Sequence, residues 1–296
     1  MDRGPEARRG LGPWAVLAIG VVGASVSAIL IRYAEGASGL ALSFWRCAAG
    51  AIVLVPFATK GLKRMQARDL VIPAFAGVSL AAHFATWITS VNLTTIASSV
   101  LLVSTTPIFV ALAERWVFND RMPAIGWVGI ALALGGTVLI AGLDFEGSSL
   151  EGNVLALAGA ITVTGYVMGG RRARQKLGIL EYAVVTYGFA AVALLPICVL
   201  GGVELGGYPD KTWLAIAGLI AGPQLLGHTL INMALSDIDA TTVSVTVMAE
   251  PVIAILLALV LFSEVPSTLA YPGGLAILIG IYLVSVVRRE PAVIVE

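Results

Sequence analysis

Charged residues are scarce in this sequence. Asp, Glu, Lys and Arg make up 12% of its 296 residues, whereas a soluble domain carries about 25%. Hydrophobic residues fill 58% of the chain, and the mean hydropathy is +0.94. These values exclude a soluble globular enzyme, a disordered chain and a disulfide-rich secreted domain. The formal net charge is +0, so no basic excess points to a nucleic-acid partner.

Cysteine, histidine and catalytic signatures are nearly missing as well. Cys47 and Cys198 both lie inside apolar runs, where cysteine behaves as a small buried residue. The two histidines stand alone, without the cysteine or carboxylate cluster that a metal site requires. The sequence has no phosphate-binding Walker loop, no Gly-x-Ser-x-Gly motif and no aspartate pair within an apolar run. It therefore predicts no enzyme, no cofactor, no metal site and no ATP-driven pump.

Long apolar runs dominate the sequence instead. A membrane-spanning helix needs about 20 apolar residues, and runs of this length predict an all-α integral membrane protein with ten transmembrane helices. The runs do not alternate with period two, which excludes a β-barrel. Short loops with proline and glycine breakers separate them. The expected spans are 13–33, 39–59, 70–91, 95–118, 123–143, 152–170, 179–201, 212–234, 240–262 and 267–287.

The positive charges assign an orientation to this bundle. With an even number of spans both termini lie on one face, and that face collects fifteen of the eighteen Lys and Arg residues. The opposite face has Arg32 and Lys211, and Arg46 lies inside a span. We therefore expect both termini in the cytoplasm. Residues 1–28 also have features of a cleaved signal peptide, but their removal would leave nine spans and break the repeat described next.

The second half of the sequence repeats the first. Residues 94–140 align with 238–284 without gaps, at an offset of 144. The chain is thus predicted to consist of two five-helix repeats, 1–146 and 147–296. Because five is odd, the second repeat must be inverted relative to the first. Inverted repeats are typical of secondary transporters, whose substrate site lies near the membrane midplane between the repeats.

The duplicated motifs carry a family resemblance. A Pro-(x)10-Phe-x-acidic pattern starts at Pro107 and at Pro251, and a Gly-(x)6-Gly pattern follows each time. With the Glu250-Pro251 dipeptide, this pattern resembles the drug/metabolite transporter superfamily, in particular the EamA-type ten-helix exporters. It is also similar to the bacterial amino-acid exporters of the YddG type. Thr106 stands where the second repeat has Glu250, so a role for that glutamate belongs to one repeat.

The resemblance implies a fold and a function. It implies alternating access around a central site in a bacterial inner membrane, with export of small metabolites, foremost amino acids. The implied partners are a small-molecule substrate and the lipid bilayer, with the chain a monomer or a loose dimer. A drug or nucleotide-sugar exchanger of the same superfamily is the alternative, and an ion channel is a more remote one. Proton exchange and facilitated diffusion both remain open as energy sources.

Two matched polar stripes are the main candidates for the site. Each consists of three residues one helical turn apart, at a constant offset of 145. Polar groups deep in a span avoid lipid, and the repeat symmetry places both stripes near the bundle axis. We expect them to line a cavity, although helix–helix hydrogen bonding is the alternative. The stripes are Ser79, His83 and Trp87, and Gln224, His228 and Asn232.

Aromatic and charged residues complete the predicted site. Tyr166, Tyr187 and Trp45 lie within spans and can form its walls, although Trp45 is also placed as an interfacial anchor. Arg46 and Glu250 are the full charges that we place clearly inside the membrane. They form either a structural ion pair, or a site where Arg46 meets a substrate carboxylate and Glu250 an ammonium group or proton. So few charges favour a small zwitterion or neutral metabolite over a nucleotide sugar.

Two prolines are candidate hinges. Pro107 and Pro251 fall midway along the fourth and ninth spans, where proline removes a backbone hydrogen bond and kinks the helix. The kinks are interpreted either as hinges for alternating access or as static shape. Carbonyl groups freed by such kinks are tolerated in a membrane where they line a cavity.

Overall fold

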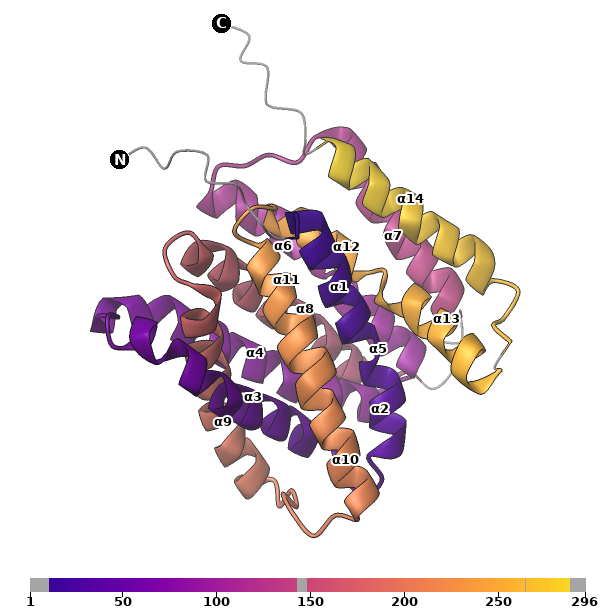
Figure 1. Ribbon diagram of the computed structural model, residues 1–296. Helices are drawn as coiled ribbons and strands as arrows, with labels where there is room; N and C mark the ends of the chain where they lie inside the picture. The colour runs from indigo at the N-terminus through magenta and orange to yellow at the C-terminus, as the bar shows by residue number, and fades with distance from the viewer. Residues whose placement is uncertain (1–10, 143–147, 264, 288–296) are drawn as a thin grey trace, which may run out of the picture.

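The structure, a computed structural model, is all-helical (Figure 1) and describes residues 11–142, 148–263 and 265–287. Ten segments in these ranges are long and apolar enough to cross a membrane, and each overlaps a predicted span with ends that differ by at most four residues. They are Pro13–Tyr33, Gly39–Leu62, Ala67–Leu93, Ile96–Val117, Ala124–Ala141, Leu150–Arg174, Ile179–Leu200, Asp210–Ala234, Ala240–Leu261 and Ala270–Val287. The predicted repeat boundary at 146/147 and the predicted termini lie outside the described residues.

Several spans consist of more than one helix. In chain order the helices are α1 (Pro13–Ser25), α2 (Ser27–Tyr33), α3 (Gly39–Leu62), α4 (Ala67–Leu93), α5 (Ile96–Val103), α6 (Thr106–Val117), α7 (Ala124–Ala141), α8 (Leu150–Arg174), α9 (Ile179–Leu200), α10 (Asp210–Leu219), the π-helical segment η1 (Ile220–His228), α11 (Thr229–Ala234), α12 (Ala240–Val247), α13 (Glu250–Phe262) and α14 (Ala270–Val287). We call the face where α1 begins and α14 ends the terminal face, and the other the opposite face.

The fourth and ninth spans break at equivalent places. Two residues separate the end of α5 from the start of α6, and two separate the end of α12 from the start of α13. Pro107 and Pro251 each fall in the first turn of the new helix, where the missing N–H has no intrahelical partner to lose. Each span is therefore interrupted by two non-helical residues, and each proline withholds the N–H that would bond to the carbonyl four residues before it in an unbroken helix.

Glycines bring the fifth and tenth spans together. α7 and α14 lie side by side on one side of the molecule, away from α3, α4 and α9 (Figure 1). A Cβ atom at Gly136 would collide with the backbone of Gly273, and one at Gly129 would lie 2.8 Å from the carbonyl oxygen of Gly280. The repeated Gly-(x)6-Gly pattern is thus explained by close helix packing within the chain.

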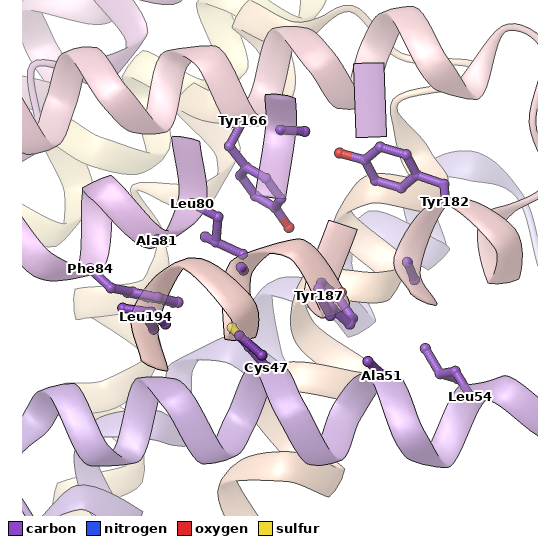
Figure 2. Close-up of a cluster of buried hydrophobic side chains, with 14 of the residues drawn as sticks. Cys47, Ala51, Leu54, Leu80, Ala81, Phe84, Tyr166, Tyr182, Tyr187 and Leu194 are labelled. Carbon is purple, nitrogen blue, oxygen red and sulfur yellow. The ribbon is translucent and has the colours of Figure 1, made fainter. Parts of the chain in front are cut away.

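Tyrosines from two helices enter the core where α3, α4, α8 and α9 meet. Figure 2 shows Tyr166 of α8 with Tyr182 and Tyr187 of α9, around Cys47 and Leu80. Each of these five side chains is at most 3% exposed. This packed core fixes α4 and α8 against each other, and those two helices carry much of the site described next.

Candidate functional site: a central cavity

A cavity of about 440 Å³ lies between the two repeats, within the size range of small-molecule sites. Its lining includes residues from α1 to α8 and from η1, α11, α12 and α13. Seven of the predicted residues line it: His83, Trp87, His228, Arg46, Glu250, Pro107 and Pro251. Ser104, Thr106 and Ser244, beside the helix breaks, also contribute. In the described residues, no group of three or more His, Cys, Asp or Glu side chains is placed to hold a metal ion.

An aromatic wall from α4 forms the first-repeat side of the cavity. The rings of His83 and Trp87 stack with centroids 5.8 Å apart and planes 9° from parallel. Phe84 lies beside His83, with the centroids 5.5 Å apart. The Nδ1 atom of His83 is 2.9 Å from the carbonyl oxygen of Gly159 on α8. The helical spacing of His83 and Trp87 therefore produces a rigid, flat surface suited to an apolar or aromatic group.

On the second-repeat side, His228 has a polar backing. The hydroxyl of Tyr166 lies 3.3 Å from Nδ1 of His228, and Nδ2 of Asn232 donates to that hydroxyl at 2.5 Å. Tyr166 is 3% and Asn232 is 1% exposed. Neither is among the cavity-lining residues, so both lie behind the histidine. The ring of Phe84 packs edge-on against the ring of His228, with their centroids 6.4 Å apart.

Four other predicted site residues lie outside the lining. Ser79 lies against Gly165 at the α4–α8 contact. Gln224 is fully buried against Gly50, and neither of its amide atoms has a hydrogen-bond partner. The hydroxyl of Tyr187 pairs with that of Thr229 at 3.1 Å. Trp45 donates from Nε1 to the carbonyl oxygen of Leu205 at 3.0 Å, and its ring packs on Trp213 near the opposite face.

Two opposite charges line the cavity without forming an ion pair with each other. Arg46 is 8% exposed, its Nε has no hydrogen-bond partner, and its guanidinium lies 5.4 Å from the ring centroid of Phe84. Glu250 is half-buried at the start of α13. They are the charged members of the lining in the described part of the chain. A cation and an anion are thus both available to a bound molecule.

The two helix breaks differ in whether the carbonyl four residues before the proline finds another hydrogen-bond donor. Pro107 cannot donate to the carbonyl of Val103, but the Thr106 hydroxyl does so at 2.7 Å. In the second repeat Glu250 replaces the threonine, and an ionised carboxylate can only accept hydrogen bonds. The equivalent Val247 carbonyl therefore gains no donor from the residue beside Pro251, and Val247 also lines the cavity.

A third buried charge, which the sequence patterns did not predict, lies near the terminal face. Glu114 of α6 is fully buried and forms an ion pair with Arg171 of α8. It also accepts hydrogen bonds from the backbone N–H of Ala240 at 2.7 Å and from the hydroxyl of Thr241 at 2.5 Å. This network joins the end of α6 to the start of α12. Its burial could have been predicted from the position of Glu114 inside the fourth expected span, one helical turn before the end of that span.

The ten spans, the two similar halves and the central cavity define a multi-pass membrane transporter rather than an enzyme. The chain matches the EamA-like transporter family twice, over residues 12–142 and 150–286, and it belongs to that family. The two matches correspond to two five-span repeats. Since each repeat has an odd number of spans, the second crosses the membrane in the inverted sense.

Relatives of known sequence support the same class. An uncharacterized transporter, YdfC, from Bacillus subtilis (strain 168) is 25% identical over 252 residues, covering 83% of this chain and 82% of that protein. A probable terminal-alkyne amino-acid exporter from Streptantibioticus cattleyicolor is 24% identical, covering 84% of each. The inner membrane transporter YedA from Escherichia coli (strain K12) is 24% identical, covering 80% and 78%. A crystal structure 18% identical in sequence superposes with a TM-score of 0.80 over 94% of this chain and 97% of that chain, so it shares the fold.

Proposed function

We propose that this protein is a secondary transporter that exports a small zwitterionic metabolite, foremost an amino acid, by alternating access to the central cavity. The observation that carries the proposal is the pair of opposite charges, Arg46 and Glu250, that line one cavity without pairing with each other. A zwitterion supplies one group for each, which offsets the desolvation of both. A nucleotide sugar or phosphate has too many negative charges for this lining.

The groups around Glu250 suit an ammonium ion. Glu250 and Val247 both line the cavity; the Glu250 carboxylate is an acceptor, and Pro251 leaves the main-chain carbonyl of Val247 without its helical donor. Arg46 is suited to the carboxylate, because a guanidinium donates in a planar fork. A carboxylate and an ammonium group on one small molecule is the chemistry of an amino acid.

The remaining lining suits an apolar side chain. His83, Trp87 and Phe84 form an aromatic wall, and Val100, Val243 and other aliphatic residues face the same space. The relative named as a probable amino-acid exporter supports the same substrate class. Within the superfamily the alternative is a drug exchanger, which the aromatic wall also accommodates. An ion channel is disfavoured by the mostly apolar lining.

Orientation and coupling belong to the proposal as well. Fifteen of eighteen Lys and Arg residues fall on the face of the predicted termini, which favours cytoplasmic termini in a bacterial inner membrane. Pro107 and Pro251 are proposed as hinges because the spans that they interrupt line the cavity. Transport is either coupled to protons through Glu250 or a histidine, or facilitative. A rate that is unaffected by an imposed pH gradient would exclude the first.

Counterflow in proteoliposomes tests the proposal. Vesicles preloaded with unlabelled L-phenylalanine or L-leucine should take up the labelled amino acid with saturable kinetics. Trp87→Ala and His83→Ala should reduce this uptake while the purified proteins remain monodisperse and folded. Lys211→Gln, which removes an exposed ion pair with Glu35 near the opposite face, is the matched control and should leave uptake unchanged. No counterflow with any amino acid, together with exchange of a lipophilic cation, would instead establish a drug exchanger.

A further inference from the structure

We propose that the two cavity histidines are held in opposite neutral tautomers, so that His228 presents a hydrogen-bond donor to the substrate and His83 presents an acceptor. The assignment of tautomers follows from the contacts of the two rings alone. Its consequence for substrate orientation rests on the proposed function. Tyr166 and Asn232 are positioning residues in this proposal, because they act on the substrate only through His228.

The tautomer of His228 is set by a chain of hydrogen bonds with one direction. The amide nitrogen of Asn232 can only donate, so the Tyr166 hydroxyl accepts at 2.5 Å. That hydroxyl has a single hydrogen, and the ring nitrogen Nδ1 of His228 lies 3.3 Å away. If the phenol donates there, Nδ1 carries the lone pair and Nε2 carries the hydrogen. The same amide nitrogen is held in place by a second bond, to the main-chain oxygen of His228 at 2.7 Å.

The opposite direction would leave the buried hydroxyl hydrogen of Tyr166 without an acceptor at normal hydrogen-bond distance. If Nδ1 of His228 donated to the phenol, the hydroxyl would accept twice, and its own hydrogen would need a further partner. The only other hydroxyl near enough to accept it in the described residues is that of Tyr187, which is paired with Thr229 at 3.1 Å. The hydrogen bonds of normal length formed by the Tyr166 hydroxyl are those with Asn232 and His228. Tyr166 is 3% exposed, and an unpaired buried donor is strongly disfavoured. The Nε2–H tautomer of His228 is therefore favoured.

His83 is in the reverse situation. Its Nδ1 atom lies 2.9 Å from the main-chain oxygen of Gly159, and a carbonyl oxygen can only accept. Nδ1 must therefore carry the hydrogen, which leaves the lone pair on Nε2. Both histidines pack on the same helix, α8, but one meets a carbonyl oxygen and the other a phenol. Symmetric positions in the two repeats thus acquire opposite hydrogen-bonding character.

The Nε2 atom of each histidine ring is available to a molecule bound in the cavity. Both histidines are lining residues, and neither Nε2 is among the buried side-chain atoms that lack a partner. Phe84 lies next to both rings and also contacts the guanidinium of Arg46. A substrate carboxylate placed between Arg46 and His228 would meet donors on both sides. An ammonium or amide N–H group would find an acceptor in Nε2 of His83, which fixes the direction in which a zwitterion binds.

Nitrogen-15 NMR of the histidine side chains tests the tautomers directly, because the chain contains only two histidines. In protein labelled with ¹⁵N-histidine, the His83→Gln variant shows only the signals of His228, and the His228→Gln variant shows only those of His83. We expect Nε2 of His228 and Nδ1 of His83 to give the signals of protonated nitrogens, with the other nitrogen of each ring unprotonated. Tyr166→Phe should change the His228 signals towards a mixture of tautomers and leave those of His83 unchanged.

Tyr182→Phe is the matched control for that variant, because Tyr182 lies in the same buried cluster but, in the described part of the chain, its hydroxyl forms no hydrogen bond with either histidine or with Tyr166. It should leave both sets of signals unchanged. A hydrogen on Nδ1 of His228, the same tautomer in both rings, or a doubly protonated His228 would overturn the proposal. None of these outcomes depends on whether an amino acid is transported.

A transport measurement tests the consequence separately. Glutamine can place an N–H near the position of histidine Nε2, so His228→Gln should keep most of the L-phenylalanine affinity, whereas His228→Leu should raise KM about tenfold or more. For L-phenylalaninamide, which lacks the carboxylate, the difference between the two variants should be small. Equal losses for both substrates would contradict the orientation. No transport of either, with the expected NMR signals, would refute the proposed function and leave the tautomers established.

Discussion

At the residue scale, some buried polar groups in this protein have all their hydrogen-bond partners and others have none. Glu114 has an ion pair and two further donors, and the Tyr166 hydroxyl connects two partners. Nε of Arg46 and both amide atoms of Gln224 have no partner among the described side chains and backbone. Paired groups fix one arrangement, whereas unpaired ones are available to a ligand or carry a cost. The two classes therefore predict opposite effects of substitution.

Gln224→Met should stabilise the protein. The side chain of Gln224 is completely buried, with 0% of its surface exposed. A buried polar group without a hydrogen-bond partner destabilises the folded protein by about 1–3 kcal/mol. Methionine has a similar shape without that penalty, so thermal unfolding in detergent should move to a higher temperature. Gln175→Met, at an exposed position after α8, should change stability by less than about 0.5 kcal/mol. A lowered unfolding temperature for Gln224→Met would show that the amide has a partner essential to the fold.

The sequence predicted part of the site at this scale. Helical spacing placed His83, Trp87 and His228 on inward faces, and these three residues do line the cavity. The same spacing could not distinguish a cavity-facing side chain from one between two helices, and Ser79 and Gln224 lie in the second environment. Aliphatic lining residues such as Val243 gave no signal, because apolar residues occupy every face of a buried membrane helix.

At the scale of single elements, the proline breaks are matched in position and different in chemistry. Thr106 donates to the carbonyl that Pro107 leaves open, while Glu250 cannot do the same beside Pro251. The first break therefore has a replacement donor from its own side chain, and the second leaves the carbonyl of Val247, a cavity-lining residue, without one from the equivalent side chain. This difference is visible only when the helix ends are known, since the sequence predicted a kink at both prolines.

Thr106→Val should destabilise the fourth span. The substitution keeps the side-chain shape but removes the hydroxyl that bonds to Val103 at 2.7 Å, which costs about 1 kcal/mol. Thr106→Ser keeps the hydroxyl and should restore most of that stability. Thermal unfolding of the three proteins in the same detergent provides the comparison. Equal unfolding temperatures for the valine and serine variants would mean that this hydrogen bond does not stabilise the break.

The glycines of α7 provide a second matched pair. A Cβ atom at Gly136 would collide with the backbone of α14, but one at Gly135, the preceding residue, has nothing within 4 Å. Gly136→Ala should therefore destabilise the protein by about 1–3 kcal/mol through overpacking. Gly135→Ala should be neutral or stabilising by about 0.5–1 kcal/mol, because alanine favours a helix over glycine. Unfolding temperatures that shift in the same direction for both variants would contradict the packing of α7 on α14.

Helix positions were predicted well from the sequence because composition fixes them. Apolar runs of about 20 residues have few alternatives to a membrane helix, and the ends differ from the structure by at most four residues. The π-helical segment η1, which contains Pro223, was not predicted, because the apolar pattern of the eighth span continues through it. This segment packs against α1 and α3.

At the scale of the whole molecule, the two repeats are related in sequence but do not pack in the same way. α6 packs against α12, and Glu114 joins the two near the terminal face. The symmetry-related pair, α13 and α5, makes no comparable contact within the part of the chain that the structure describes. Ala258 stands at the position equivalent to Glu114. This network therefore closes the contact between α6 and α12 near the terminal face, and the other repeat has no equivalent glutamate.

Glu114→Gln should weaken this closure. It removes the ion pair with Arg171, and loss of one partner from a buried ion pair costs about 3–5 kcal/mol. A reporter cysteine at Val100, which lines the cavity in the half near the opposite face, measures the effect, because the native cysteines are both buried. Labelling of Val100→Cys from the opposite face should slow when Glu114→Gln is added. The exposed Glu151→Gln change should not alter labelling, and an unchanged rate with Glu114→Gln would exclude the closure.

The architecture was predictable from the sequence, and the conformation was not. The offset of 144 between the halves indicated two repeats, and the odd number of spans in each required their inversion. Which end of the cavity closes depends on small differences between nearly equivalent contacts. The Glu114 network is one such difference, and its members come from three segments that are distant in sequence.

The most direct test of the account is a binding measurement that removes one charge from the protein and one from the ligand. Affinities of L-phenylalanine and 3-phenylpropionate, which lacks the ammonium group, would be compared between the wild type and Glu250→Gln by competition with a labelled amino acid. We predict that the variant binds L-phenylalanine about 10- to 100-fold more weakly, as expected for about 1.5–3 kcal/mol from a charge-assisted hydrogen bond. Its affinity for 3-phenylpropionate should be unchanged. Equal losses for both ligands, or no loss for either, would contradict a cavity that binds a zwitterion through Glu250.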